Sequence, residues 1–256
     1  MIRDYTSPLL AKEEVSPGIW HLKFQSPEIA AAARPGNFIL VKTAEGTAPL
    51  LRRPLGILDA DAGNGTVEVL FRVVGRGTDL LARSVIGKEY SIRGPVGGCF
   101  KDFKHKDVWA VAGTLGIAPL MFLRKELGKF GELFLGVGNA RWKSFADWCA
   151  ERAPELTLYS DDGSIGCKGF SIAGLEGRDL SDVTIVCCGP NPMMKALYAQ
   201  YGASCDDILV SLEKRMGCGM GGCYGCVVDT VTGRRRVCID GPVFRAEEVK
   251  WDELHL

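Results

Sequence analysis

The sequence carries no excess charge of either sign, because 31 lysine and arginine side chains balance 31 aspartate and glutamate side chains. Proteins that bind nucleic acid or an anionic membrane surface usually carry a basic excess, so we expect neither as a partner. Histidine is also scarce, and the three histidines lie in unrelated contexts: His21, His105 and His255. They indicate no catalytic dyad, no Ser/His/Asp arrangement and no histidine metal site.

A long apolar run is missing as well. The most apolar stretch, residues 108–123, is interrupted by Gly113, Gly116 and Pro119 and is too short to cross a bilayer. The N-terminal residues show no basic start followed by an apolar core, so we expect no signal peptide. These features together predict a cytoplasmic protein.

Cysteine, in contrast, is abundant, with ten in 256 residues. Without a secretion signal, a disulfide framework is not the expected use of these thiols. Four of them lie close together near the C-terminus. We expect most of the other six to act as small buried apolar side chains; they are Cys99, Cys149, Cys167, Cys187, Cys188 and Cys205.

Residues 1–103 have the pattern of a β domain. Apolar and polar residues alternate within residues 20–24, 66–73 and 90–93. Turn residues separate these runs at positions 35–36, 63–65 and 94–95. Short strands at regular spacing are typical of an antiparallel barrel.

Residues 104–208 change to strands that alternate with helices. We expect strands at 108–112, 133–137, 156–159 and 184–188, and helices at 120–127, 144–152 and 192–201. This alternation predicts a parallel sheet with helices on both faces. With the barrel and a small C-terminal segment, the chain is predicted to be a multidomain β plus α/β protein.

The C-terminal segment, residues 209–256, contains EKRMGCGMGGCYGCVVDTVTGRRRVC. Its cysteines follow the spacing C-x4-C-x2-C-x11-C, which matches the plant-type ferredoxin order for a [2Fe–2S] cluster. The intervening glycines would let the loop wrap closely around a cluster. Structural zinc is the alternative, although zinc sites usually show two C-x2-C pairs. We predict four cluster ligands: Cys218, Cys223, Cys226 and Cys238.

Two other motifs lie in the first domain. LLRRPLGI places Arg52 and Arg53 before a proline, which would suit an arginine fork that binds a diphosphate. A solvated turn between two strands would look the same and is favoured on these residues alone. FRVVGRGT contains Gly75 and Gly77, which mark a bulge or turn or let a ring system approach the backbone.

Two glycine turns lie in the second domain. VAGTLGIAPL ends one expected strand and opens a helix, and backbone N–H groups there suit a dinucleotide pyrophosphate. CCGPNPMM is a second turn of this kind at the same edge of the sheet, so the pair predicts a ligand crevice. Asp161 and Asp162 follow another strand and could bind ribose hydroxyls, although such a pair is more often a solvated turn.

In chain order, PGNF, LLRRPLGI, FRVVGRGT, RGPVGG, AGTLGIAPL, DDGSIGCKG, CGPNPMM and EKRMGCGMGGCYGC…C…DGPVF resemble the ferredoxin-reductase-like flavoproteins. The sequence is most similar to the electron-transfer subunits of class 1B dihydroorotate dehydrogenases. The resemblance covers nearly the whole chain, and the cysteine segment is its most specific part. It implies an FAD-binding barrel at 1–103, an NAD-binding α/β domain at 104–208 and a [2Fe–2S] segment at 209–256.

The resemblance also implies which residues contact each cofactor. Along FAD it places Arg53, Pro54, Leu55, Gly56, Leu70, Phe71, Arg72, Gly77 and Thr78. At the nicotinamide nucleotide it places Gly113, Thr114, Gly116, Ile117, Pro119, Cys188, Gly189 and Pro190.

Two positions depart from the family pattern. Gly56 stands where the family usually has a Ser or Thr whose hydroxyl contacts the flavin ring. The hydrogen bond to flavin N5 is therefore in doubt. Asn37 replaces the usual Gln in PGNF, which is a milder change.

The resemblance implies an oxidoreductase subunit with no general acid or base of its own. A cluster carries single electrons and nicotinamide accepts a hydride, whereas a flavin does both. The expected path therefore runs from a partner's FMN through the cluster and FAD to NAD⁺. The partner would be the catalytic chain that oxidises dihydroorotate in pyrimidine biosynthesis, within a heterotetramer of two chains of each kind.

Two alternatives remain. One is a flavin and iron–sulfur NAD(P)H oxidoreductase subunit that serves another partner, in ferredoxin:NADP chemistry or in sulfur or hydrogen metabolism. The other is a non-enzymatic iron–sulfur or zinc module on a degenerate reductase fold.

Overall fold

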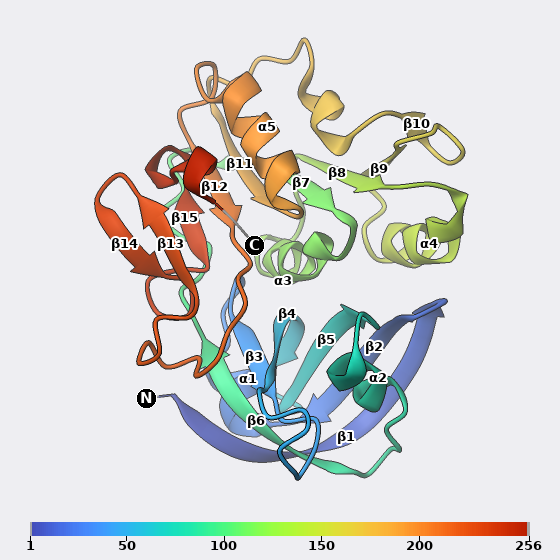
Figure 1. Ribbon diagram of the computed structural model, residues 1–256. Coiled ribbons are helices and arrows are strands. Elements are labelled where there is room, and N and C mark those ends of the chain that lie inside the picture. Colours follow the sequence, from blue (N-terminus) through green and yellow to red (C-terminus); the bar gives the residue numbers. More distant parts are fainter. Residues whose placement is uncertain (1, 255–256) are drawn as a thin grey trace.

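The structure, a computed structural model, describes residues 2–254, so His255 lies outside the described residues. Figure 1 shows a barrel built from the first strands, an open sheet flanked by helices, and a C-terminal segment beside both. This arrangement confirms the predicted multidomain β plus α/β fold. Within residues 2–254, no helix combines the length and the apolar character that a bilayer crossing requires.

Six antiparallel strands close into the barrel in the order β1-β2-β5-β4-β3-β6. They are β1 (Arg3–Ser16), β2 (Ile19–Gln25), β3 (Phe38–Val41), β4 (Arg53–Asp61), β5 (Thr66–Arg72) and β6 (Glu89–Val96). Leu22 and Phe24 of β2 pair with Val69 and Val67 of β5, and these side chains fill the interior. The antiparallel barrel is confirmed, but β1 was not predicted, because its apolar and polar residues do not alternate cleanly.

Two short helices accompany the barrel, α1 (Pro27–Ala32) and α2 (Arg76–Ala82). Gly75 and Gly77, interpreted as a bulge or turn or as a place where a ring system approaches the backbone, lie where the chain turns from β5 into α2. Gly75 immediately precedes α2, and Gly77 lies in its first turn.

The second sheet has the order β10-β9-β8-β7-β11-β12-β15. Its strands are β7 (Asp107–Gly113), β8 (Glu132–Val137), β9 (Leu156–Ser160), β10 (Cys167–Lys168), β11 (Val183–Cys188), β12 (Ile208–Ser211) and β15 (Val243–Arg245). Only the last pairing, between β12 and β15, is antiparallel among those described. The predicted parallel sheet is therefore confirmed, with one added antiparallel edge strand.

Helices cover both faces of this sheet, as predicted. They are α3 (Ile117–Leu127), α4 (Lys143–Arg152) and α5 (Asn191–Tyr201). On β11, Ile185 and Cys187 pack on the side of α5, whereas Val186 and Cys188 pack on the side of α3 and α4. Short 3-10 helices lie at Thr114–Gly116, Ala140–Trp142, Ser171–Leu175, Ala246–Glu248 and Trp251–Glu253.

The C-terminal segment shares its core with the other two parts. Its hairpin consists of β13 (Val227–Thr230) and β14 (Gly233–Arg236), and β15 then returns to the sheet. Buried Cys226 and Cys238 belong to one apolar cluster with Leu40 of the barrel and Val210 of β12. The boundary predicted between the second domain and the C-terminal segment, between residues 208 and 209, falls inside β12 (Ile208–Ser211). One strand therefore belongs to both.

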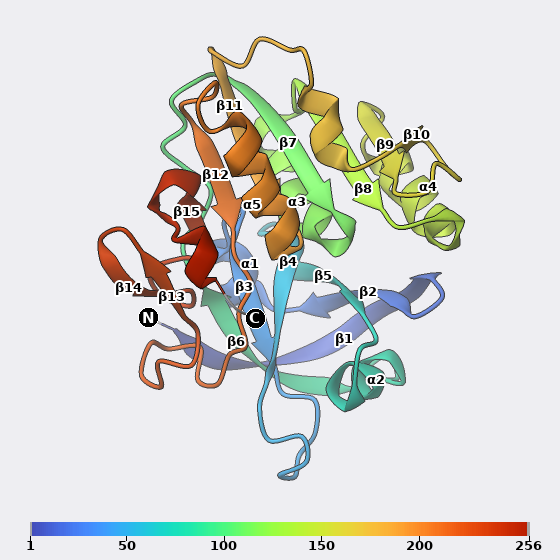
Figure 2. The same ribbon diagram turned by 45° about the horizontal axis from the view of Figure 1, so that its top comes forward.

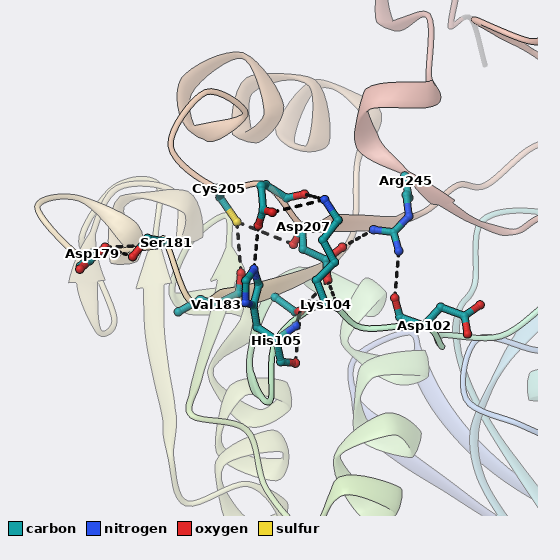
Figure 3. A network of polar contacts seen from close by, with 11 residues as sticks. Asp102, Lys104, His105, Asp179, Ser181, Val183, Cys205, Asp207 and Arg245 are labelled. Carbon is teal, nitrogen blue, oxygen red and sulfur yellow. Dashed lines mark hydrogen bonds and ion pairs between the residues drawn. The ribbon is translucent and has the colours of Figure 1, made fainter.

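A buried carboxylate ties this segment to the rest of the molecule (Figure 3). Asp207 is fully buried and accepts hydrogen bonds from the Lys104 amide at 2.7 Å and the Thr184 hydroxyl at 2.6 Å. It also pairs with the guanidinium of Arg245, which donates to the carbonyl of Asp102 at 2.9 Å. The network joins the chain between the two larger domains to β11 and β15.

A second polar group joins the barrel to α4. Glu68 of β5 lies 2.8 Å from His21 Nε2 and 2.9 Å from Lys23 Nζ. The His21 ring in turn packs edge-on against Trp148 of α4, with 5.5 Å between ring centroids. The hydrogen bond with His21 and the Lys23 ammonium outweigh partial burial and lower the pKa of Glu68 from 4.5 to about 2.

We expect Glu68→Gln to lower the free energy of unfolding at pH 7. A pKa shift from 4.5 to about 2 corresponds to at most roughly 3 kcal/mol. A carboxylate with a lowered pKa stabilises the fold above its ordinary pKa. The difference between wild type and variant should therefore shrink as the pH falls from about 4.5 toward 2. Urea unfolding at several pH values, followed by tryptophan fluorescence, measures this difference in the free energy of unfolding.

Glu13→Gln is the matched control, because Glu13 lies 3.7 Å from the other ring nitrogen of His21 but is 54% exposed. Its loss should change stability by well under 1 kcal/mol. Equal effects of the two substitutions would contradict the role assigned to Glu68.

Candidate functional site

A cleft of about 820 Å³ lies where the barrel, the parallel sheet and the C-terminal segment meet. Its walls come from β4 and β5, from the turns after β7 and β11, and from residues 211–216. Figure 2 shows the ends of β4 and β7 and the start of α5 converging at this place. The carboxyl edge of the sheet therefore faces the barrel across the cleft, as parallel α/β sheets usually present their ligand sites.

Most of the expected cofactor contacts line this cleft. From the barrel they are Arg53, Pro54, Leu55, Gly56, Leu70, Phe71, Arg72 and Thr78. From the sheet they are Gly113, Thr114, Gly116, Pro119, Cys188, Gly189 and Pro190. Two expected contacts do not line it: Ile117 is buried in α3, and Gly77 lies behind Arg53.

The tandem arginines of LLRRPLGI do not form one fork. Arg53 faces the cleft and lies against Gly77, where an added Cβ would come within 2.7 Å of the guanidinium carbon. Arg52 borders the cleft, but its guanidinium is bound to Asp4 at 2.7 Å and to the carbonyl of Ser91 at 2.6 Å. Arg53 donates from Nη1 to the carbonyl of Leu51 at 2.6 Å and pairs with no carboxylate among the described residues, so its charge can serve an anion in the cleft.

The two glycine turns of the sheet pack directly against each other. An added Cβ on Gly116 would collide with the carbonyl of Cys188, and one on Gly113 would come within 2.6 Å of Pro190. Thr114, between these glycines, has a φ of 49°, a left-handed conformation that β-branched residues rarely adopt. Such backbone strain is typical of functional turns.

Gly56 leaves space at the barrel wall. The nearest heavy atom to an added Cβ would be Cδ of Pro119, at an ordinary contact distance of 3.7 Å. A serine side chain would therefore start without a backbone clash, and packing does not require glycine here.

Several cleft residues were not anticipated. Asn191 begins α5, and its buried side-chain nitrogen has no hydrogen-bond partner among the described residues. It belongs to the quoted motif CCGPNPMM, which could have indicated it. Trp142 lies 5.8 Å from the guanidinium of Arg72 and bridges sheet and barrel, but no local sequence signal marks it.

Glu213 is another unanticipated cleft residue. Its side chain keeps exposed surface, yet the protein surrounds it within the concave cleft, and this desolvation raises the pKa of its carboxyl group. Burial also raises the pKa of the Cys188 thiol, and the nearby Glu213 carboxylate adds to the rise. Cys188 therefore keeps a neutral, buried thiol beside the cleft.

The four motif cysteines lie outside the cleft lining and form two pairs. The amide of Cys218 donates to Cys223 Sγ at 3.5 Å. Cys226 and Cys238 are both buried, and the amide of Val237, next to Cys238, donates to the carbonyl of Cys226 at 3.0 Å. Within residues 2–254, no group of three or more His, Cys, Asp or Glu side chains could hold a single metal ion. Two thiol pairs suit a two-iron cluster, in which each iron takes two protein sulfurs.

Backbone groups in the loop point toward the first pair. The amide of Met220 donates to Cys218 Sγ at 3.3 Å. Partial burial raises the pKa of the Cys218 thiol, but N–H groups of Met220, Cys223 and Gly222 outweigh it and lower the pKa to about 6. Gly219, with a φ of 66°, permits the tight turn between them. These N–H groups favour the thiolate form of Cys218, the form that iron requires, whereas burial raises the pKa of Cys238 to about 12.

Asp161 and Asp162 do not line the cleft. Asp162 accepts a hydrogen bond from the amide of Ser164 at 2.9 Å, as in an Asx turn. This hydrogen bond is typical of a solvated turn, the interpretation that the sequence analysis gave beside ribose binding.

Comparison with known proteins assigns both cofactor regions. Residues 6–100 match the family "Oxidoreductase FAD-binding domain", and residues 213–250 match the "Iron-sulfur cluster binding domain of dihydroorotate dehydrogenase B". These matches confirm FAD and an iron–sulfur cluster among the predicted cofactors.

Among solved structures, the chain is similar to the NADH-dependent reduced ferredoxin-NADP oxidoreductase. The TM-score is 0.83 at 29% identity, over 97% of this chain and 91% of that one. Phthalate dioxygenase reductase shares the fold, with a TM-score of 0.63 at 14% identity, over 89% of this chain and 87% of that one.

Curated relatives extend over almost the whole chain. The dihydroorotate dehydrogenase B (NAD(+)) electron transfer subunit of Desulforamulus reducens is 34% identical, over 98% of this chain and all of the relative. The protein of that name from Geobacillus kaustophilus is 38% identical, over 84% of this chain and 86% of the relative. The chain therefore belongs to the family of dihydroorotate dehydrogenase B electron transfer subunits.

Proposed function

We propose that this chain is the electron-transfer subunit of a dihydroorotate dehydrogenase. It takes electrons from an FMN-containing catalytic subunit and delivers them, through a [2Fe–2S] cluster and FAD, to NAD⁺ in pyrimidine biosynthesis. One observation carries the proposal: a single cleft is lined by the barrel, by two glycine turns and by the segment that continues into the cysteine loop. That arrangement suits a flavin with access to both a nucleotide and a cluster.

The barrel residues of the cleft would hold FAD. Arg53 offers its guanidinium to the diphosphate, with Gly77 and Thr78 of α2 behind it. The β4 backbone at Pro54–Gly56 and the β5 residues Leu70–Arg72 form an extended wall for the ring system. Because Gly56 has no hydroxyl, any hydrogen bond to the flavin at this position would come from the backbone.

The glycine turns would hold the nicotinamide nucleotide. Their interlocked backbones place Thr114 and Pro190 at the cleft, and the unpaired amide of Asn191 is ready to donate to a bound nucleotide. The neutral thiol of Cys188 excludes water without adding charge beside the reacting ring.

The cysteine loop would hold the cluster through Cys218, Cys223, Cys226 and Cys238. When bound, the cluster supplies single-electron transfer and the flavin converts between single electrons and a hydride. We divide the chain accordingly into an FAD unit at 1–103, a nucleotide unit at 104–208 and a cluster unit at 209–256. Because β12 belongs to both the nucleotide unit and the cluster unit, it would hold these two units in a fixed relative position.

The relatives' name, electron transfer subunit, supports a separate catalytic subunit for this chain too. The family resemblance suggests a heterotetramer of two chains of each kind. None of the ten cysteines forms a disulfide, which is usual in the reducing cytoplasm, the location that we propose.

A second candidate is a subunit of a ferredoxin:NADP oxidoreductase, favoured by the TM-score of 0.83 with that structure. Both candidates use the same cleft and loop. Only the partner and its substrate distinguish them.

The deciding experiment uses the complex purified anaerobically from its own cells. Addition of dihydroorotate and NAD⁺ should produce NADH, and removal of the partner subunit should abolish this activity. If no NADH forms while added NADH still bleaches the bound flavin, the dihydroorotate assignment is wrong and the partner is a different enzyme.

We expect Gly116→Ala to slow reduction of the bound flavin by NADH at least tenfold. Its methyl group would collide with the backbone of Cys188 and Gly189 and force the two turns apart. FAD content should stay near that of wild type, since the barrel residues are untouched. Stopped-flow absorbance of the flavin measures the rate.

Gly138→Ala, at the end of the neighbouring strand β8, is the control. Its methyl group would meet only Trp142 Nε1, at 3.8 Å, and should leave the rate close to that of wild type. Unaltered reduction in Gly116→Ala would show that the turns do not hold the nucleotide.

We expect Cys223→Ser to remove the cluster while FAD stays bound and reducible by NADH. The cysteine loop does not line the cleft, so the two cofactors have separate ligands. Iron content, flavin content and the visible spectrum of the full-length protein show whether the cluster is lost and whether FAD is retained. Loss of FAD together with iron would argue against independent sites.

A further inference from the structure

The cysteine loop rests on the outer surface of the FAD barrel. Leu40 of β3 and Arg93 of β6 are cross-strand partners, so their side chains share one face. Leu40 packs against Gly219, where an added Cβ would lie 2.6 Å from its Cδ1. Arg93 donates from Nη1 to the carbonyl of Cys218 at 2.8 Å. Figures 1 and 2 both place this loop beside β6.

Arg93 belongs to a charged group that joins the loop to the cleft-forming strand. Its Nε lies 2.6 Å from one oxygen of Asp4, and Arg52 Nη2 lies 2.7 Å from the other. Arg52 immediately precedes Arg53 at the start of β4. The side chains of Arg52 and Arg93 are 14% and 18% exposed, so solvent screens this group only in part.

The charges of the group do not cancel. Two guanidinium groups share the single carboxylate of Asp4, and the hydrogen bond from Arg93 keeps the pKa of that carboxyl below its ordinary value. One net positive charge therefore remains beside the loop. Arg236 also touches the loop, at the carbonyl of Gly221, but Asp240 neutralises it one to one.

We propose that Arg93 is a positioning residue that holds the Cys218 end of the loop on the barrel and raises the reduction potential of the cluster. The inference rests on the proposed function, because it requires a cluster on the four cysteines. Reduction adds one negative charge to the loop. A fixed, partly buried cation bound to the peptide of a ligand favours that state. The same side chain connects the cluster loop to the strands that line the flavin cleft.

The test is a redox titration of the cluster in the complete complex, followed by the EPR signal of its reduced form. Arg93→Gln should lower the ratio of reduced to oxidised cluster about tenfold at a fixed potential, or about 59 mV for a one-electron couple. Arg93→Lys, which keeps the charge, should recover part of the loss. Asp4→Asn removes the neutralising carboxylate and should shift the ratio in the opposite direction.

Arg83→Gln is the control for a change of charge alone. Arg83 lies at the end of α2, is 76% exposed, and pairs with Asp79 at 2.9 Å. Figure 1 shows α2 on the side of the barrel away from the cysteine loop. This variant should leave the cluster potential unchanged.

The outcomes separate the inference from the proposed function. Absence of an iron–sulfur signal in the wild-type complex would refute the cluster itself. With the signal present, unchanged potentials, or shifts of the same sign in Arg93→Gln and Asp4→Asn, would overturn the role of Arg93. If Arg93→Gln does not retain the cluster, Asp4→Asn decides alone: a raised potential supports the inference, and any other result overturns it.

Discussion

The buried carboxylate of Asp207 fixes how the three parts of this molecule are joined. An unpaired carboxylate at full burial would cost several kcal/mol, so its three partners must all be in place. They come from the chain between the domains, from β11 and from β15. Satisfying this one group therefore sets the C-terminal segment against the parallel sheet. The cysteine loop follows directly, because the chain leaves β12 at Ser211, forms the cleft wall through residue 216 and reaches Cys218 two residues later.

That arrangement explains why one cleft can serve two kinds of electron transfer. The barrel and the glycine turns face each other across it, and the chain that closes the third side is the chain that enters the cysteine loop. A flavin in the cleft would have a nucleotide on one side and the cluster loop nearby. For this task the cofactors would supply the chemistry, and the protein would supply positions and local charges.

Much of this could be predicted from local sequence patterns. The strands and helices of the parallel sheet follow from hydrophobic periodicity, and the cysteine spacing indicates the cluster without tertiary information. Long-range features could not be read in the same way. β1 has no clean alternation because parts of both its faces are exposed. Asn191 lies within a motif that could have indicated it, but Trp142 and Glu213 join the cleft lining only after the domains pack together, and no pattern in their neighbouring residues signals this.

The adjacent arginines Arg52 and Arg53 also show that local sequence does not reveal long-range contacts. From the sequence, one fork of Arg52 and Arg53 on a diphosphate was the functional interpretation, and a solvated turn was favoured over it. Adjacent residues in extended backbone point to opposite sides, so two neighbouring arginines cannot easily serve one ligand. The structure separates them: Arg53 faces the cleft, and Arg52 reaches Asp4 and, through it, Arg93 and the cysteine loop. In the proposed function, one dipeptide would thus contribute to the flavin site on one side and to the charge around the cluster loop on the other. A substitution at either position would be expected to affect a different cofactor.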